Sequence, residues 1–342
     1  MKSNFFIPLI LLPLQLFSQQ IKIAFGSCGH QDKPLAILKN IAQSKPDYFI
    51  YLGDNIYGDT RDMKVMKQKY DKLAANPNFK LLKKKTKILA TWDDHDFGEN
   101  DAGRYYPKKE ESKQLFLQFF KEPKHSDRWK HQGVYTSYLI LKKKVRIQII
   151  LLDLRTFRNE LTKFDQSTIQ KDTIFHYDLD YAPTLSADST LLGLAQWNWL
   201  KEELTKEADI RIIGSSTQFG PTYNGYEAWA NFPFERQKML EMIQRTGANG
   251  VLFISGDVHY AELSKVMNKY TYPILDLTAS GLTQEWKFAT PNANRIAGPV
   301  MENHYGQLII DLKKNTINMQ IIDINKQVRI DYVVNWKDLK FK

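Results

Sequence analysis

Four short stretches of the chain place side chains of metal-binding types directly after apolar runs. They read GSCGH at residues 26–30, GDNIYGD at 53–59, WDDHDFGEND at 92–101 and SGDVHYAE at 255–262. Together they supply a thiol, several carboxylates, a phenol and imidazoles. These donors suit iron or another transition metal, and a calcium ion beside it would take oxygen ligands. Jointly the stretches predict a metal centre, although each one alone is also typical of a capped or solvated turn.

The apolar runs before these stretches predict β-strands, and segments between them predict helices. The predicted strands cover residues 21–25, 48–52, 88–91 and 251–255. Strands that alternate with helices indicate an α/β fold with a parallel or mixed sheet. Because the carboxyl ends of such strands converge on one crevice, we expect the four stretches to meet there.

Further patterns predict the rest of the scaffold. Helices are expected at residues 34–43, 108–120, 193–206 and 234–245. Additional strands are expected at residues 135–141, 145–152, 210–214 and 274–277. Short strands separated by Lys-Asn and Asn-Lys turns are expected to pair antiparallel at one side of the sheet, at residues 305–312, 317–324 and 329–334. No Gly/Ser/Pro linker divides residues 20–342, which favours one domain.

The composition is that of a globular protein. The chain has 342 residues, of which 43% are hydrophobic and 13% aromatic, so it can bury a large core. Its formal charge is +10, and the lysine runs at 83–85 and 142–144 are typical of a solvated surface. The sequence contains no zinc-finger spacing, RNP-like pattern or heptads, so we expect no stable nucleic-acid complex. The remaining basic character is compatible with an anionic, even polyanionic, substrate.

The amino terminus has the layout of a secretory signal peptide. An early lysine precedes an apolar run from Phe5 to Phe17, and small or polar residues follow. The run is short and is interrupted by Pro8 and Pro13, so it is unsuited to span a membrane. We therefore expect residues 1–19 to be a signal peptide, and the rest of the chain to be a secreted or periplasmic protein without a transmembrane segment.

Cys28 is the single cysteine of the chain. An exported protein with one cysteine cannot form an intrachain disulfide, which leaves a buried inert thiol or a metal-ligating thiolate. A tyrosine-phosphatase loop would need an arginine shortly after the cysteine, and the residues that follow are GHQDKP. G-x-S-x-G and P-loop motifs are also absent, so the sequence excludes catalysis of those kinds.

Several stretches together resemble one enzyme family. GSC, GDNIY, WDDHDFGEND, LDLRTFR, GLAQWNWL, WANFPFER, GDVHYAE and DLTASGLT occur in the same order as in alkaline phosphatase D-like (PhoD-like) metallophosphatases, from residue 21 to at least residue 282. The combination of GDNIY, WDDHD and GDVH is the specific part of the match. The resemblance implies a calcineurin-like metallophosphoesterase fold of the α/β (α+β) class, a four-layer sandwich in which two mixed β-sheets are flanked by helices.

The resemblance implies a ferric ion held by a thiolate, a carboxylate and a phenolate. The matching positions are Cys28, Asp54 and Tyr57, and Asp54 corresponds to a carboxylate that bridges two metal ions. The spacing of three between Asp54 and Tyr57 after a strand also favours ligation over simple core packing of the tyrosine. Other divalent transition metals would accept the same donors.

A second set of matching positions implies a calcium ion beside the iron. Asp94 stands where superfamily relatives place an amide ligand, and Asp257 and His259 match a pair of histidine ligands. A carboxylate at Asp257 in place of a histidine fits Ca²⁺, which prefers oxygen. His95 falls at the substrate-facing histidine. Gln218 lies where superfamily relatives place another histidine, and its ligation stays open.

The chemistry of phosphate-ester cleavage fits this set of residues. Paired metal ions lower the pKa of bound water and neutralise charge on the transferred group. We expect in-line attack by metal-activated hydroxide, with His95 as the catalytic general acid for the leaving oxygen. Its acidic neighbours Asp93 and Asp96 are expected to orient it or keep it protonated. The sequence thus predicts an exported metal-dependent phosphoric ester hydrolase, an alkaline phosphatase or phosphodiesterase.

Two other functions stay open. The chain could be a secreted binding protein whose metals only stabilise a surface, without turnover. It could also be a phosphodiesterase specific for phospholipid, nucleic acid or cell-wall polymer, because the same two-metal site cleaves monoesters and diesters. His304 fits either a pocket position or ordinary packing, and the sequence indicates no oligomeric state.

The roles of five polar residues near the predicted centre also stay open. Asp96, Asn100 and Asp101 fit ligands of an additional calcium ion, groups that orient ligands, or a capped polar loop. Arg155 and Arg158 follow a core strand. We interpret them as partners of structural carboxylates rather than of phosphate.

Overall fold

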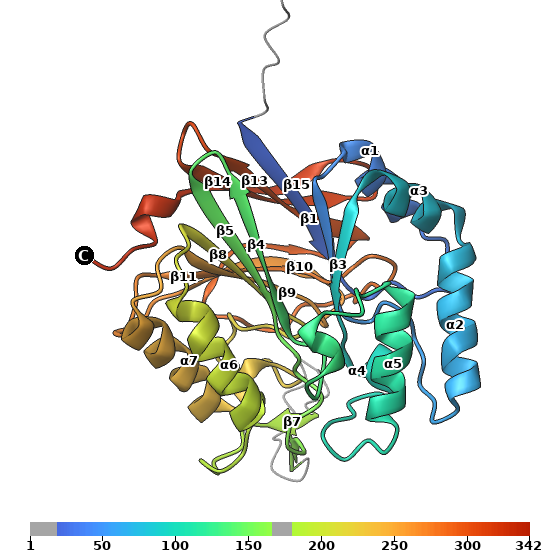
Figure 1. The fold of residues 1–342 in the computed structure, drawn as a ribbon. Helices are drawn as coiled ribbons and strands as arrows, with labels where there is room; N and C mark the ends of the chain where they lie inside the picture. The colour runs from blue at the N-terminus through green and yellow to red at the C-terminus, as the bar shows by residue number, and fades with distance from the viewer. Residues whose placement is uncertain (1–18, 166–179) are drawn as a thin grey trace, which may run out of the picture.

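The computed structural model describes residues 19–165 and 180–342, which form two stacked β-sheets between two layers of helices (Figure 1). The first sheet has the strand order β15-β14-β13-β1-β2-β3. The second has the order β12-β10-β11-β9-β8-β5-β4, and the short strands β6 and β7 pair with each other. Both large sheets mix parallel and antiparallel pairs. This arrangement confirms the predicted four-layer sandwich.

The elements of the first sheet and its helical layer come from both ends of the described chain. The strands are β1 (Gln20–Gly26), β2 (Tyr48–Leu52), β3 (Lys87–Thr91), β13 (His304–Asp311), β14 (Thr316–Asp323) and β15 (Val328–Asn335). The helices are α1 (Ala36–Ser44), α2 (Met63–Ala75), α3 (Pro77–Lys85), α4 (Asp94–Phe97) and α5 (Lys109–Phe119).

The second sheet and its helices come from the middle of the chain. The strands are β4 (Thr136–Lys142), β5 (Val145–Leu151), β8 (Ile210–Ser215), β9 (Val251–Ser255), β10 (Ala261–Val266), β11 (Ile274–Ala279) and β12 (Arg295–Val300). The helices are α6 (Gly193–Thr205) and α7 (Pro233–Thr246), and the small pair is β6 (Thr162–Lys163) and β7 (Tyr181–Ala182). Short 3₁₀ turns are η1 (Asp127–Trp129), η3 (Trp229–Asn231) and η4 (Trp336–Asp338).

Alternation along the strands explains why the sheets stack. In β2, Ile50 and Leu52 join the apolar core between the two sheets, while Phe49 and Tyr51 face the helices. Successive side chains of a strand point to opposite faces, so a strand that is apolar on both faces must be covered on both sides. The outer face of the second sheet is covered in the same way by α6 and α7.

Most predicted elements are found within one or two residues of their expected bounds, and the three last strands are antiparallel as predicted. The sequence did not predict α2, α3, β10 and β12, nor the short elements α4, β6, β7 and the 3₁₀ turns. In β10 the buried Glu262 pairs with Arg295 and accepts a hydrogen bond from Gln218. A buried charge inside a strand hides the alternation that would reveal it.

The carboxyl ends of β1, β2, β3 and β9 carry the four stretches rich in metal-binding side chains. The first three strands are parallel neighbours, so their following turns lie at one edge of the sheet. Gly53, after β2, has φ of 108°, and a Cβ there would lie 2.4 Å from Cβ of Asp93. Only glycine lets the turns after β2 and β3 approach so closely.

Within the described residues, no helix combines the length and the apolar character of a membrane span. The predicted signal peptide covers residues 1–19, and residues 1–18 lie outside the described part of the chain.

His304, at the start of β13, is fully buried and does not line the predicted pocket. Its Nδ1 lies 2.8 Å from the carbonyl oxygen of Glu302, and its Nε2 has no hydrogen-bond partner among the described residues. Burial lowers the pKa of His304 to about 4. The packing interpretation of this histidine is therefore the one that the structure supports.

We predict that His304 makes folding sensitive to mild acid. An unfolded histidine binds a proton below its usual pKa of about 6.5, whereas folded His304 stays neutral down to about pH 4. Stability from this group is therefore present above pH 6.5 and falls as the pH drops toward 4. Urea unfolding at pH 7.5 and pH 5 should show a loss about 2 kcal/mol larger in the natural chain than in His304→Gln. Equal losses would contradict the assignment.

Candidate metal centre

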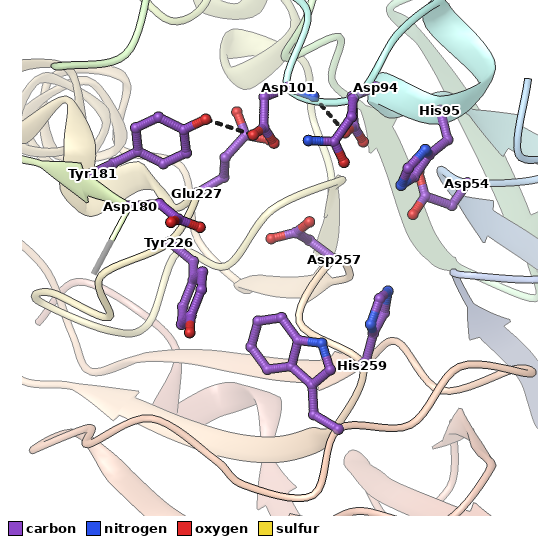
Figure 2. A pocket seen from close by; sticks show the side chains of 12 residues that line it. Asp54, Asp94, His95, Asp101, Asp180, Tyr181, Tyr226, Glu227, Asp257 and His259 are labelled. Atoms are coloured by element: carbon purple, nitrogen blue, oxygen red, sulfur yellow. Dashed lines mark hydrogen bonds between the residues drawn. The ribbon is translucent and has the colours of Figure 1, made fainter. Parts of the chain in front are cut away.

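Three groups of potential metal ligands lie side by side near the carboxyl ends of the strands, and Figure 2 shows all of their residues except Cys28. Within each group the donor atoms all lie within 4.8 Å of one another. The groups are Cys28, Asp54 and His259; Asp54, Asp94 and His95; and Asp94, Asp101 and Glu227. Consecutive groups share one carboxylate, first Asp54 and then Asp94. All of their residues except Cys28 line a cavity of about 170 Å³, together with Asn100, Asp180, Tyr181, Tyr226, Asp257 and Trp286.

The backbone at the predicted ligands is strained. Cys28, Asp54, Asp257 and His259 all have positive φ, between 49° and 82°. This left-handed conformation is uncommon for residues other than glycine and costs on the order of 1 kcal/mol or more at each position. The fold holds these four residues in place at that cost, and such outliers cluster at functional sites.

The first group combines a thiol, a carboxylate and an imidazole with a phenol close by. Sγ of Cys28 lies 3.5 Å from the carbonyl oxygen of Asp257, and the thiol is fully buried. Oη of Tyr57 lies 3.4 Å from Nε2 of His259, and the tyrosine is 6% exposed. The structure thus brings Cys28, Asp54 and Tyr57 close together, as expected, and places His259 with them instead of in the second set.

The pKa values in this cluster are shifted because its acidic side chains are buried close to one another. Burial and the neighbouring Asp54 raise the pKa of the Cys28 thiol well above its usual value. Burial and Asp94 likewise raise the pKa of Asp54. Burial and His95 lower the pKa of His259 to about 4, so its imidazole is neutral and able to bind a metal. A bound cation would reverse the penalty on the acids and favour their charged forms.

Two buried carboxylate oxygens of residues that line the cavity make no hydrogen bond to the described residues. They are Oδ1 of Asp54 and Oδ1 of Asp94, and the latter lies 3.6 Å from Nη2 of Arg155. A buried carboxylate oxygen left unpaired is costly unless a cation or a proton compensates it. These oxygens and the mixed donor set therefore fit bound metal ions.

His95 is oriented by a residue that the sequence analysis did not single out. Its Nδ1 lies 2.7 Å from Oδ1 of Asp59, and its ring packs 4.1 Å from that of Tyr57. Burial alone would lower the pKa of His95, but Asp54 and the hydrogen-bonded Asp59 outweigh it and raise the pKa to about 11. The expectation that Asp93 and Asp96 orient His95 was wrong, because both carboxylates are engaged elsewhere.

Asp96 fixes the turn after β2. Its carboxylate accepts hydrogen bonds from the backbone N–H groups of Asp54 at 3.2 Å, Asn55 at 3.4 Å and Asp93 at 2.7 Å. It is fully buried and does not line the cavity. Of the roles left open for Asp96, the structure supports the capped loop, and through that loop it positions Asp54.

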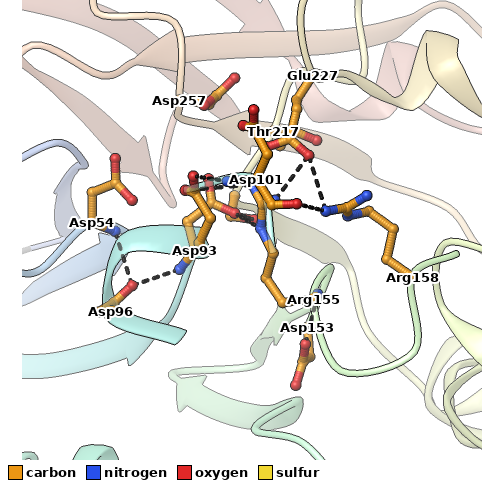
Figure 3. A network of polar contacts seen from close by, with 12 residues as sticks. Asp54, Asp93, Asp96, Asp101, Asp153, Arg155, Arg158, Thr217, Glu227 and Asp257 are labelled. Atoms are coloured by element: carbon orange, nitrogen blue, oxygen red, sulfur yellow. Dashed lines mark hydrogen bonds and ion pairs between the residues drawn. The ribbon is translucent and has the colours of Figure 1, made fainter. Parts of the chain in front are cut away.

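Arg155 lies at the centre of a group of buried ion pairs (Figure 3). Its guanidinium is 0% exposed; Nε donates to Asp93, and Nη1 donates to Glu227 at 2.8 Å. Nη2 lies 3.6 Å from Oδ1 of Asp94. Arg158 lies 3.4 Å from the same Glu227. Both arginines therefore pair with carboxylates, as interpreted from the sequence, and two of these, Asp94 and Glu227, line the cavity.

The third group explains part of what the sequence left open. Asn100 and Asp101 line the cavity, and Asp101 donates its backbone N–H to Oδ2 of Asp94 at 2.8 Å. Asp101 also accepts a hydrogen bond from the hydroxyl of Tyr181. Asp257 lines the cavity as well, but its carboxylate belongs to none of the three groups.

Gln218 takes no part in the cavity. Its amide donates to Glu262 at 2.9 Å and to Thr278 at 3.1 Å, away from the metal-binding groups. Glu227 was missed by sequence reasoning, because it follows no strand and belongs to no motif with a ligand spacing. Asp59 could have been found, since it lies in the quoted GDNIYGD stretch, five residues after Asp54.

We predict that Arg155 stabilises the fold by compensating the buried carboxylates of Asp93 and Glu227. Arg155→Met would leave Asp93 and Glu227 buried without their cation and should lower the free energy of unfolding by about 3–5 kcal/mol. Arg146→Met, in the strand β5 that precedes Arg155, is the matched control, because its pair with Glu207 is exposed and should contribute less than about 1 kcal/mol. Guanidinium unfolding of both variants measures this, and equal effects would contradict the role of Arg155.

Comparisons with known proteins give one consistent result. The family described as PhoD-like phosphatase matches residues 23–303. Alkaline phosphatase D of Bacillus subtilis (strain 168) is 21% identical over 280 residues, which cover 70% of this chain and 46% of that protein. The match therefore spans about half the length of this curated relative.

Solved structures show the same fold. The structure of PhoD superimposes with a TM-score of 0.68 at 15% identity, covering 92% of this chain and 68% of that one. A dimetal phosphatase from Danio rerio gives 0.56 at 12% identity and covers 92% and 99%. GAP50, the anchor in the inner membrane complex of Plasmodium, gives 0.55 at 13% identity and covers 94% and 89%. Because the family match extends over most of the chain, from β1 to the start of β13, the chain belongs to the PhoD-like phosphatase family.

Proposed function

We propose that this protein is a metal-dependent phosphoric ester hydrolase. The observation that carries the proposal is the row of three ligand groups joined by shared Asp54 and Asp94, with His95 at the same cavity. Family membership supports phosphoester hydrolysis as the reaction class. We further propose that the protein is exported, on the strength of the apolar amino-terminal run between Phe5 and Phe17.

The donors support two ions of different character. Cys28, Asp54, Tyr57 and His259 would hold Fe³⁺ or another transition metal. The oxygens of Asp54, Asp94 and Asp257 would hold Ca²⁺, with Asp54 shared between the ions. When bound, such a pair lowers the pKa of water and neutralises phosphoryl charge.

The residues of the chain itself would complete the reaction. His95 borders the cavity beside Asp54, and its Nδ1 is fixed by Asp59, which leaves Nε2 to give a proton to the leaving oxygen. Asp59 is a positioning residue in this scheme. Arg155 and Arg158 pair with carboxylates and would hold Asp93, Asp94 and Glu227 in place rather than the phosphate.

A second candidate is a binding protein without turnover. The likeness to the GAP50 anchor supports it only at the level of fold, because the same architecture serves an anchor in that protein. The pairing of His95 with Asp59 at an open cavity favours the hydrolase, since a metal that only stabilised structure would not require it.

Removal of metal is the direct test of the hydrolase. Purified protein should contain bound metal and hydrolyse p-nitrophenyl phosphate or bis(p-nitrophenyl) phosphate, and chelation should abolish hydrolysis until metal returns. Because two groups share Asp54, Asp54→Asn should lose both ions by metal analysis, whereas Cys28→Ser should lose one. Asp71→Asn, at the exposed pair with Lys67, is the control and should keep both. A metal-loaded but inert protein would favour the binding protein.

Substitution of His95 separates a general acid from a ligand. His95→Asn should keep the metal content and slow hydrolysis of an alkyl phosphate by about 10²–10⁴-fold. Hydrolysis of a nitrophenyl ester should slow much less, because nitrophenolate leaves without a proton. Asp59→Asn should show the same selectivity with a smaller loss. Equal loss on both esters, or loss of metal from His95→Asn, would refute the general-acid role.

A further inference from the structure

One side of the cavity is an aromatic wall, which we define as Tyr226, Trp286 and Phe288. The rings of Trp286 and Phe288 stack at 5.1 Å with an interplanar angle of 18°. The ring of Tyr226 lies 4.8 Å from that of Trp286. Tyr226 and Trp286 line the cavity, and Phe288 packs against Trp286 from outside the lining. The wall therefore places two aromatic side chains, Tyr226 and Trp286, where a substrate would enter.

The aromatic wall is attached directly to the metal centre. Trp286 meets the ring of His259 edge-on at 5.5 Å, and its backbone N–H donates to the carbonyl oxygen of His259 at 3.2 Å. A phosphate placed among Asp54, His95 and His259 would thus carry its organic arm to the wall. Neither the proposed metal binding nor the proposed proton transfer involves these rings.

The charge around the aromatic wall is negative. Of the twelve described residues that line the cavity, six are Asp or Glu and none is Lys or Arg. Figure 2 shows Asp180, Tyr181, Tyr226 and Glu227 on the side opposite His95 and Asp54. Metal ions would balance the carboxylates of the ligand groups, and Arg155 pairs with Glu227. Asp180 also lines the cavity on the aromatic side and belongs to none of the three ligand groups.

We propose that the aromatic wall and Asp180 bind the organic arm of the substrate and select phosphate esters whose arm carries an ammonium group. This rests on the proposed hydrolase function and specifies its substrate class. An ammonium ion is attracted both by π-faces and by nearby carboxylates, whereas an anionic arm is repelled by the same carboxylates. The basic character of the chain thus lies outside the cavity, and a polyanionic substrate is disfavoured.

Three esters that share a nitrophenyl reporter test the proposal. They are p-nitrophenyl phosphorylcholine, its uncharged isostere with a tert-butyl group in place of trimethylammonium, and an analogue with a carboxylate there. The cationic ester should have a kcat/KM about 10-fold above the isostere, and the anionic ester should be the poorest of the three. An isostere that equals or exceeds the cationic ester would overturn the proposal.

Variants assign the preference to the wall. Trp286→Leu and Asp180→Asn should each reduce the ratio of cationic to uncharged ester to about 2-fold or less. Trp199→Leu is the matched control, because this tryptophan lies outside the cavity and should leave the ratio unchanged. A ratio that survives both wall substitutions would refute the role of these residues.

A binding measurement separates this proposal from the hydrolase itself. Calorimetry on the metal-loaded protein with choline phosphate and with its tert-butyl isostere gives the same ratio without turnover. Tighter binding of choline phosphate that disappears in Trp286→Leu supports the wall even if no ester is cleaved, which would count against hydrolysis alone. Equal affinities in a protein that hydrolyses p-nitrophenyl phosphate would reject the wall and leave the hydrolase intact.

Discussion

The buried guanidinium of Arg155 holds the carboxylates at the metal centre together, and the arrangement of the site depends on these ion pairs. Carboxylates of Asp93, Asp94 and Glu227 reach it from the turn after β3 and from the segment before α7. Without a central cation these groups would repel one another in a medium that screens charge poorly. The planar fork of an arginine can serve several carboxylates at once, which a lysine cannot do with the same directionality. These three carboxylates can therefore lie close together before any metal ion or substrate binds.

Much of this architecture could be read from the sequence because it follows from local patterns. The strands β2 and β9 lie where continuous apolar runs predict them, and each ends in a Gly-Asp turn. Parallel strands bring such turns together, so the neighbourhood of Cys28, Asp54 and His259 could be anticipated without coordinates. The resemblance to a family implied a division of the ligands between two ions, and that division stays a prediction.

The remainder depends on contacts between segments that no local pattern records. Glu227 lies at the metal centre because it pairs with Arg155, which is far from it in the sequence. Trp286 borders the cavity only because its loop is tied to the backbone of His259. The expected partners of His95 were its sequence neighbours, but α4 turns Asp96 toward backbone N–H groups and leaves the imidazole to Asp59. Adjacency along the chain is a poor guide to which side chains meet in a short helix.

The sharing of Asp54 and Asp94 has a consequence for how the centre fills. Each of these carboxylates belongs to two neighbouring groups, so an ion in one group alters the position and charge of a donor in the next. Coupling of this kind is reciprocal: whatever the first ion does to the affinity for the second, the second does in equal measure to the first. The groups are thus coupled sites, and the affinity of each for a metal ion depends on whether its neighbour is filled.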